Sequence, residues 1–189
     1  QGLWKSTDQG GTWAKINTGA GSNLLDQGRL WTLAIDPFNH NTLWTSSGYG
    51  AGGPLKSTDA GVSWTRMPVG SPTQYNDVYS IQLVPYTPDH VLLAWHSAWT
   101  TDDSNSGVTE SSDGGRSWTN HQPPKGSSWG AGNAAWFLDN SHTWLLGSQN
   151  GGIWRTSDSG ASWTMVRNQN ITHGGINALL HGPGSGVFF

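Results

Sequence analysis

Short runs of β-branched and aromatic residues alternate along the chain with clusters of Gly, Ser, Thr and Asn. Such runs predict short strands, and the clusters between them predict turns. No segment shows a sustained apolar period of 3.6 residues, so we expect little helix. One unit reads as an inner strand at 30–35, a turn at 36–39, a second strand at 42–46 and two further strands at 54–58 and 63–67. The pattern predicts an all-β chain.

The same four-strand pattern returns along the sequence. Whole units span 30–67, 78–121 and 134–167, and half units span 1–17 and 176–189. The first half unit has the pattern of two outer strands, and the last has the pattern of two inner strands. The halves therefore either combine into one composite unit or belong to a longer array. Residues 1–189 are predicted to form a single domain or segment.

An eight-residue motif of the form [ST]-x-D-x-G-x-[ST]-W marks each unit. It recurs about every 50 residues, the length of a four-stranded propeller blade. Its Asp accepts hydrogen bonds from nearby backbone N–H groups, its Gly supplies a positive φ, and its Trp covers apolar surface. We therefore assign structural roles to the motif residues Asp8, Trp13, Asp59, Trp64, Asp113, Trp118, Asp158 and Trp163.

The four motifs resemble the Asp-box, or BNR, repeat. The resemblance covers nearly the whole chain and extends to sialidases, xyloglucan-specific endoglucanases, sortilin-type receptors and the photosystem II assembly factor. It implies a β-propeller of four-stranded antiparallel blades, with four repeats in this chain. The arrangement is either a closed four-bladed disc or part of a larger or oligomeric propeller. Because these families do unrelated things, the motif predicts fold better than function.

Composition excludes several classes of function. The chain has 189 residues, a net charge of −3 and nine Lys or Arg, so nucleic acid is not expected as a partner. No apolar run reaches the length of about 20 residues that a membrane helix needs. Cysteine is absent, and the seven His follow no metal-binding spacing. We predict no metal site, no cofactor and no membrane span.

The resemblance places ligands on the face opposite the Asp-boxes, where long loops gather. Aromatic rings there offer flat surfaces for sugars, although loop tryptophans also fill gaps between blades. An inner-strand Arg and two His fall near the same face. The candidate ligand-binding residues are Arg29, Tyr49, Tyr75, His96, Trp99, Trp129 and His173.

Paired carboxylates are the candidates for catalysis, because glycoside hydrolysis uses two of them. Asp26 and Asp77 precede successive inner strands, so both can project toward the centre; the alternative is that they cap turns. Glu110, the only Glu, lies beside an Asp-box and is assigned a structural role. No arginine triad of the sialidase type can be assembled from this chain. An enzyme here is therefore expected to be glycoside hydrolase-like and not a typical sialidase.

Two functions remain open at this level. The first is a secreted propeller, extracellular or periplasmic, that binds or processes a polysaccharide or glycan through its loop aromatics. The second is a non-enzymatic scaffold for protein interaction or assembly, through a protein partner or self-association. Loops on a rigid scaffold concentrate binding residues in either case.

Overall fold

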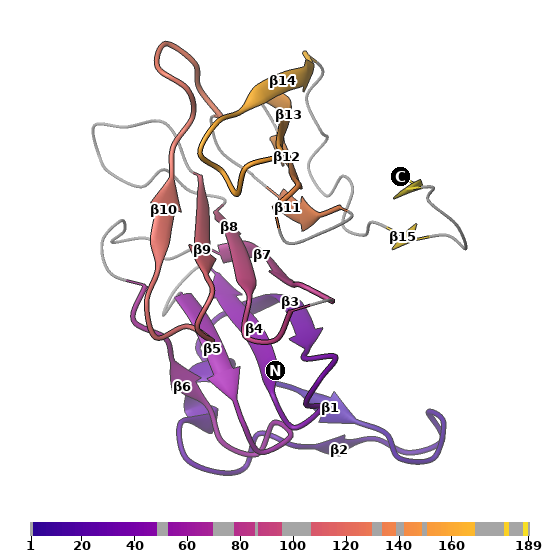
Figure 1. The fold of residues 1–189 in the computed structure, drawn as a ribbon. Coiled ribbons are helices and arrows are strands. Elements are labelled where there is room, and N and C mark those ends of the chain that lie inside the picture. The colour runs from indigo at the N-terminus through magenta and orange to yellow at the C-terminus, as the bar shows by residue number, and fades with distance from the viewer. Residues whose placement is uncertain are drawn as a thin grey trace.

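The structure is a computed structural model of the chain, and it consists of antiparallel sheets (Figure 1). It describes residues 2–48, 53–69, 78–85, 87–95, 107–129, 134–138, 142–148, 151–168, 180–181 and 187–188. A short 3₁₀ helix, η1 (Ser22–Asp26), precedes the first complete sheet. Among the described residues, no helix has the length and apolar character that a membrane crossing requires.

Three complete sheets follow one another, each with four strands in chain order. Sheet I contains β3 (Arg29–Ile35), β4 (Leu43–Gly48), β5 (Gly53–Ser57) and β6 (Thr65–Arg66). Sheet II contains β7 (Val78–Leu83), β8 (Val91–Trp95), β9 (Val108–Ser111) and β10 (Thr119–His121). Sheet III contains β11 (Ala134–Phe137), β12 (Trp144–Ser148), β13 (Gly152–Thr156) and β14 (Thr164–Arg167). The predicted all-β architecture of antiparallel four-stranded units is confirmed.

Two hairpins lie at the ends of the chain. The first is β1 (Trp4–Lys5) with β2 (Ala14–Lys15), and the last is β15 (Leu180–His181) with β16 (Val187–Phe188). Each is a separate two-stranded sheet among the described residues, and Figure 1 draws the two apart. A composite unit built from both hairpins stays a prediction.

The outer strands are shorter than the apolar pattern predicts. The pattern extends the last strand of sheet I over 63–67, but β6 covers Thr65–Arg66. The reason is that the preceding backbone is bound elsewhere: Ser63 N donates to Asp59 Oδ1 (2.8 Å) and Trp64 N donates to Ala20 O (2.8 Å). These N–H groups serve the turn and the neighbouring segment, so they are lost to the strand ladder.

The eight-residue motifs form the turns between the third and fourth strands. We name them turn 1 (Ser6–Trp13), turn 2 (Ser57–Trp64), turn 3 (Ser111–Trp118) and turn 4 (Thr156–Trp163). In turn 4, Asp158 Oδ1 accepts bonds from Thr156 Oγ1 (2.7 Å) and Ser162 N (2.9 Å), and Asp158 Oδ2 accepts one from Ser162 Oγ (2.6 Å). Trp163 Nε1 donates to Gly160 O (3.1 Å), which fixes the ring over the turn. The carboxylate therefore replaces strand pairing as the internal support of each turn.

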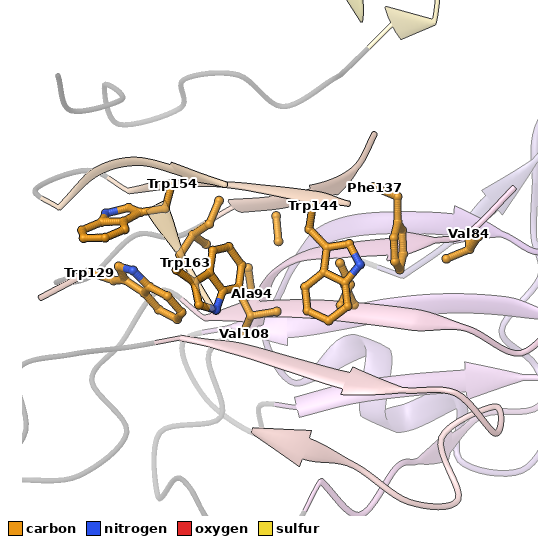
Figure 2. Packing of buried hydrophobic residues seen from close by; sticks show 11 residues of the cluster. Val84, Ala94, Val108, Trp129, Phe137, Trp144, Trp154 and Trp163 are labelled. Carbon is orange, nitrogen blue, oxygen red and sulfur yellow. The ribbon is translucent and has the colours of Figure 1, made fainter. Parts of the chain in front are cut away.

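The core lies between the sheets. In β8 all five residues are buried, because sheet II is covered on both faces. Val91, Leu93 and Trp95 pack with Trp44 of sheet I, whereas Leu92 and Ala94 pack toward sheet III. The second interface is rich in aromatic rings, with Phe137, Trp144, Trp154 and Trp163 among its members (Figure 2). Large aromatic rings bury much apolar surface each, and here they join consecutive sheets.

Candidate functional site

The inner strands of sheets I and II each contain an irregularity in their pairing. In β3 the register shifts between Leu30 and Leu33, and in β7 it shifts between Val78 and Ser80. Such β-bulges redirect side chains and are frequent beside binding sites. The residues at the two bulges include Trp31 and Tyr79, both partly buried. Each bulge therefore takes an aromatic side chain out of the regular alternation of its strand.

The two bulged aromatic side chains meet between the sheets. The ring centroids of Trp31 and Tyr79 lie 5.2 Å apart, with an edge-on angle of 60°. This contact is possible because β7 packs directly against β3. Arg29, an exposed predicted ligand-binding residue, begins β3 opposite Gly48 of β4. We call Arg29, Trp31 and Tyr79 the bulge site.

The sequence pattern did not single out Trp31 or Tyr79, because both fall within predicted strands. Adjacent bulky residues, Leu30–Trp31 and Val78–Tyr79, are the signal that was present in the sequence. In a regular strand such neighbours point to opposite faces. A bulge that redirects one of them depends on pairing with the next strand, which the sequence of one strand does not specify.

Trp129 was predicted to contact ligand, but the structure places it in the core. Its exposed fraction is 0%, and it belongs to the cluster between sheets II and III. Its ring packs edge-on against Trp163, with centroids 4.9 Å apart, and Ser148 Oγ donates to its carbonyl. Figure 2 shows the indole among Trp154 and Trp163. The alternative expectation, a tryptophan that fills a gap, describes this position.

Asp26, predicted as a catalytic carboxylate, ends η1 and forms an ion pair with Lys15. The distance from Lys15 Nζ to Asp26 Oδ2 is 3.0 Å, and both side chains are exposed. Its predicted partner Asp77 lies outside the described residues, so the pairing stays a prediction. The same holds for the remaining predicted ligand residues Tyr49, Tyr75, His96, Trp99 and His173.

The turn carboxylates are engaged inside their own turns. Bonds from Ser162 and Thr156 lower the pKa of Asp158 to about 2, and bonds from Thr12 and Ser6 lower the pKa of Asp8 to about 2. The pKa values of Asp59 and Asp113 are lowered by their neighbouring serines as well. A carboxylate held ionised in this way suits a structural role better than proton donation.

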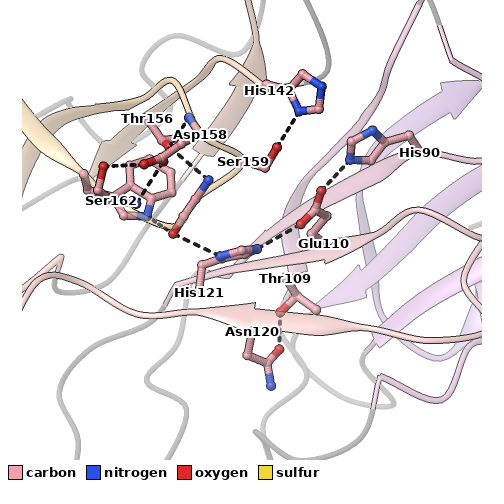
Figure 3. Close-up of polar contacts among 12 residues, drawn as sticks. His90, Thr109, Glu110, Asn120, His121, His142, Thr156, Asp158, Ser159 and Ser162 are labelled. Atoms are coloured by element: carbon pink, nitrogen blue, oxygen red, sulfur yellow. Dashed lines mark hydrogen bonds and ion pairs between the residues drawn. The ribbon is translucent and has the colours of Figure 1, made fainter.

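A cluster of three polar side chains lies in the interface between sheets II and III. Glu110 of β9 binds His90 and His121, and all three side chains are largely buried (Figure 3). We call these residues the His–Glu–His cluster. In the part of the chain that the structure describes, no group of three or more His, Asp or Glu side chains is arranged to hold a metal ion.

Comparisons with known proteins identify the fold. No protein-family model and no curated protein matches the sequence. Among solved structures, an ancestral GH74 enzyme matches with a TM-score of 0.66 and 25% identity over 87% of this chain and 21% of its own. The GH74 xyloglucanase from Xanthomonas campestris matches with a TM-score of 0.58 and 22% identity over 82% of this chain and 22% of its own.

A different kind of protein gives a comparable match. YCF48 bound to D1 peptide has a TM-score of 0.54 and 14% identity, over 77% of this chain and 42% of its own. The chain thus spans between about a fifth and two fifths of these proteins. Together with the antiparallel four-stranded sheets, the matches show a β-propeller fold. They include both glycoside hydrolase-family proteins and a peptide-bound protein.

Proposed function

We propose that this chain is an Asp-box β-propeller, or part of one, that binds a carbohydrate at the bulge site. The observation that carries the proposal is the Trp31–Tyr79 pair, brought together by bulges on two neighbouring inner strands. Aromatic rings offer apolar faces on which a sugar can stack, and Arg29, at the start of the same strand as Trp31, carries hydrogen-bond donors. Two rings from different sheets give an extended ligand two points of contact.

The GH74 xyloglucanase from Xanthomonas campestris, at 22% identity, shares the fold, and its name makes xyloglucan the first glucan to test as a ligand. Tyr49, Tyr75 and Trp99, which lie outside the described residues, stay candidate contacts predicted from the sequence. We also propose that the protein is secreted, because a protein that binds extracellular polysaccharide has to reach it outside the cell.

Binding of xyloglucan, cellulose and chitin oligosaccharides, measured by isothermal titration calorimetry, tests the proposal. We expect affinity for a β-glucan. Trp31→Ala or Tyr79→Ala should weaken it about tenfold, since a central aromatic anchor is typically worth more than 1.4 kcal/mol.

The matched control is Trp13→Ala, which removes an exposed tryptophan of turn 1 that belongs to neither bulged strand. Affinity that is unchanged in Trp31→Ala and Tyr79→Ala would assign the ligand to another surface. Absence of binding to every oligosaccharide in the panel would refute the carbohydrate proposal.

Hydrolysis is a finer proposal, in which Asp26 and Asp77 act as the carboxylate pair. Release of reducing ends from the bound glucan measures it. Asp26→Asn and Asp77→Asn should each lower kcat by about 100-fold, the usual scale for loss of an acid or base. Lys15→Met separates chemistry from structure, because it breaks the Lys15–Asp26 ion pair and keeps the carboxylate. Full activity of Asp26→Asn would exclude that residue from catalysis.

A protein-interaction scaffold is the second candidate function. YCF48, which at 14% identity shares the fold alone, is bound to D1 peptide in its structure, so a protein of this fold can hold a peptide. Under this proposal a defined protein partner binds the chain, and β-glucan does not compete. Competition by β-glucan for a partner captured on the chain therefore distinguishes the two functions.

A further inference from the structure

The His–Glu–His cluster joins sheet II to the turn of sheet III. Glu110 Oε1 lies 2.7 Å from His90 Nε2, and Glu110 Oε2 lies 3.1 Å from His121 Nε2. On its other side, His121 Nδ1 lies 3.3 Å from the carbonyl oxygen of Gly160 in turn 4. The imidazole of His121 therefore bridges a carboxylate in one sheet and a backbone carbonyl in the next (Figure 3).

Both neighbours of His121 are hydrogen-bond acceptors. Burial by itself raises the pKa of Glu110, but the hydrogen bonds from His121 and His90 outweigh it and bring this pKa to about 2. Glu110 is thus an ionised acceptor near neutral pH, and the Gly160 carbonyl accepts at any pH. A neutral imidazole has one N–H and can satisfy one of these partners. Doubly protonated His121 satisfies both.

His90 differs from His121 in this requirement. It needs one proton, on Nε2, to bind Glu110, and a neutral tautomer supplies it. Its ring packs edge-on against Phe137 and Trp144, and the ring of His121 also packs against Trp144 at 5.1 Å. Both histidines bind Glu110 and pack against Trp144. His90 therefore serves as a control in the same surroundings when the protonation of His121 is measured.

Turn 4 is shaped to approach His121 closely. A Cβ atom added to Gly160 would lie 2.5 Å from His121 Nδ1 and 2.8 Å from the ring of Trp144. Only a residue without a side chain leaves room for this approach, and its φ of +80° also favours glycine. The same carbonyl accepts Trp163 Nε1, so the contact reaches the tryptophan of the turn.

The other titratable side chains on the surrounding elements contact residues other than His121. Asp113 and Asp158 bind donors inside turns 3 and 4, and His142 binds Ser159 Oγ (2.7 Å) at an exposed position. Arg155 pairs with Leu145, so it lies on the face of sheet III opposite Trp144. Among the described residues of these elements, Glu110 is the carboxylate that contacts His121.

We propose that His121 is a pH-sensitive joint between sheets II and III. The doubly protonated ring donates to both Glu110 and the Gly160 carbonyl and so holds them together. The neutral ring has one N–H, so loss of one proton releases one of the two contacts. Glu110 stays ionised, and turn 4 then separates more easily from sheet II.

Two measurements on the full chain test this joint. Imidazole ¹⁵N spectra of the wild type should show two N–H groups on His121 at pH 5.5 and one at pH 8. Hydrogen exchange in 156–163, corrected for its intrinsic pH dependence, should be about tenfold faster at pH 8, the scale of one charge-assisted hydrogen bond.

Variants separate the joint from general stability. His121→Gln keeps a neutral donor for Glu110, and should exchange equally fast at both pH values, at the wild-type pH 8 rate. His142→Gln, which changes an exposed histidine at the same turn, should retain the wild-type pH dependence. The proposal is overturned if His121 carries a single N–H at pH 5.5, a result that needs no variant to fold. It is also overturned if His121→Gln keeps the pH-dependent exchange.

Discussion

At the scale of single residues, the fourth position of turns 1, 2 and 4 carries backbone strain, because a non-glycine residue there has a positive φ. Gln9, Ala60 and Ser159 have φ values of +59°, +59° and +55°, whereas turn 3 has Gly114 at this position. Left-handed backbone brings Cβ close to the following carbonyl, so non-glycine residues are destabilised there. Turn 3 therefore has the least strained version of this position.

We predict that Ala60→Gly stabilises the chain by about 0.5–1 kcal/mol, because the strain relieved exceeds the added entropy of the unfolded state. The measurement is the urea midpoint of unfolding. Ala161→Gly is the matched control: this alanine lies in turn 4 and is absent from the residues with positive φ. It should lose stability. Equal effects of the two substitutions would contradict the argument.

At the scale of elements, the turns are held by carboxylates whose supporting donors differ. The largest cause of the low pKa of Asp158 is the side-chain hydroxyl of Ser162, but for Asp59 it is the backbone N–H of Ser63. Both folded-state pKa values lie below the ordinary 3.8, so the stabilisation is present above the pKa of the unfolded chain and is lost as the pH falls through the folded-state pKa, which is about 2 for Asp158.

We predict that Ser162→Ala raises the pKa of Asp158 from about 2 toward 3.8, because it removes the main donor. Ser63→Ala should change the pKa of Asp59 much less, since the backbone donor remains. NMR titration of the side-chain carboxyl carbons measures both. A large rise in the pKa of Asp59 in Ser63→Ala would contradict the prediction, because it would show that the serine hydroxyl is the main donor in turn 2 as it is in turn 4.

The turns and inner strands were also the elements that the sequence predicted best. Strand β3, Arg29–Ile35, agrees within one residue with the predicted inner strand at 30–35, because its apolar residues and flanking turns are local signals. The bulges at Trp31 and Tyr79 depend on register with a second strand, and the burial of Trp129 depends on a third sheet. Local pattern therefore located the scaffold, and tertiary packing determined which aromatic side chains were available to a site.

At the scale of the whole molecule, sheet I covers the face of sheet II that carries Ile81, whereas the equivalent face of sheet I, which carries Leu33, is partly exposed to solvent. Ile81 of β7 pairs with Leu93 and is 2% exposed, because sheet I packs over it. Leu33 of β3 pairs with Thr45 in the equivalent position and is 50% exposed, and Ile35 is 54% exposed. The corresponding face of sheet I therefore carries apolar side chains in contact with solvent.

Exposed apolar side chains gathered on one sheet face favour association, because burial removes them from water. We predict that the 189-residue chain self-associates, with a mass above 20.3 kDa that rises with concentration in light scattering after size-exclusion chromatography. The double variant Leu33→Lys with Ile35→Lys should shift the population toward the monomer, since each charge would have to be desolvated. Phe38→Lys is the control, because Phe38 is 54% exposed but lies beyond β3 in the following turn. Monomeric wild type, or equal dissociation by Phe38→Lys, would show that this face of sheet I does not drive association.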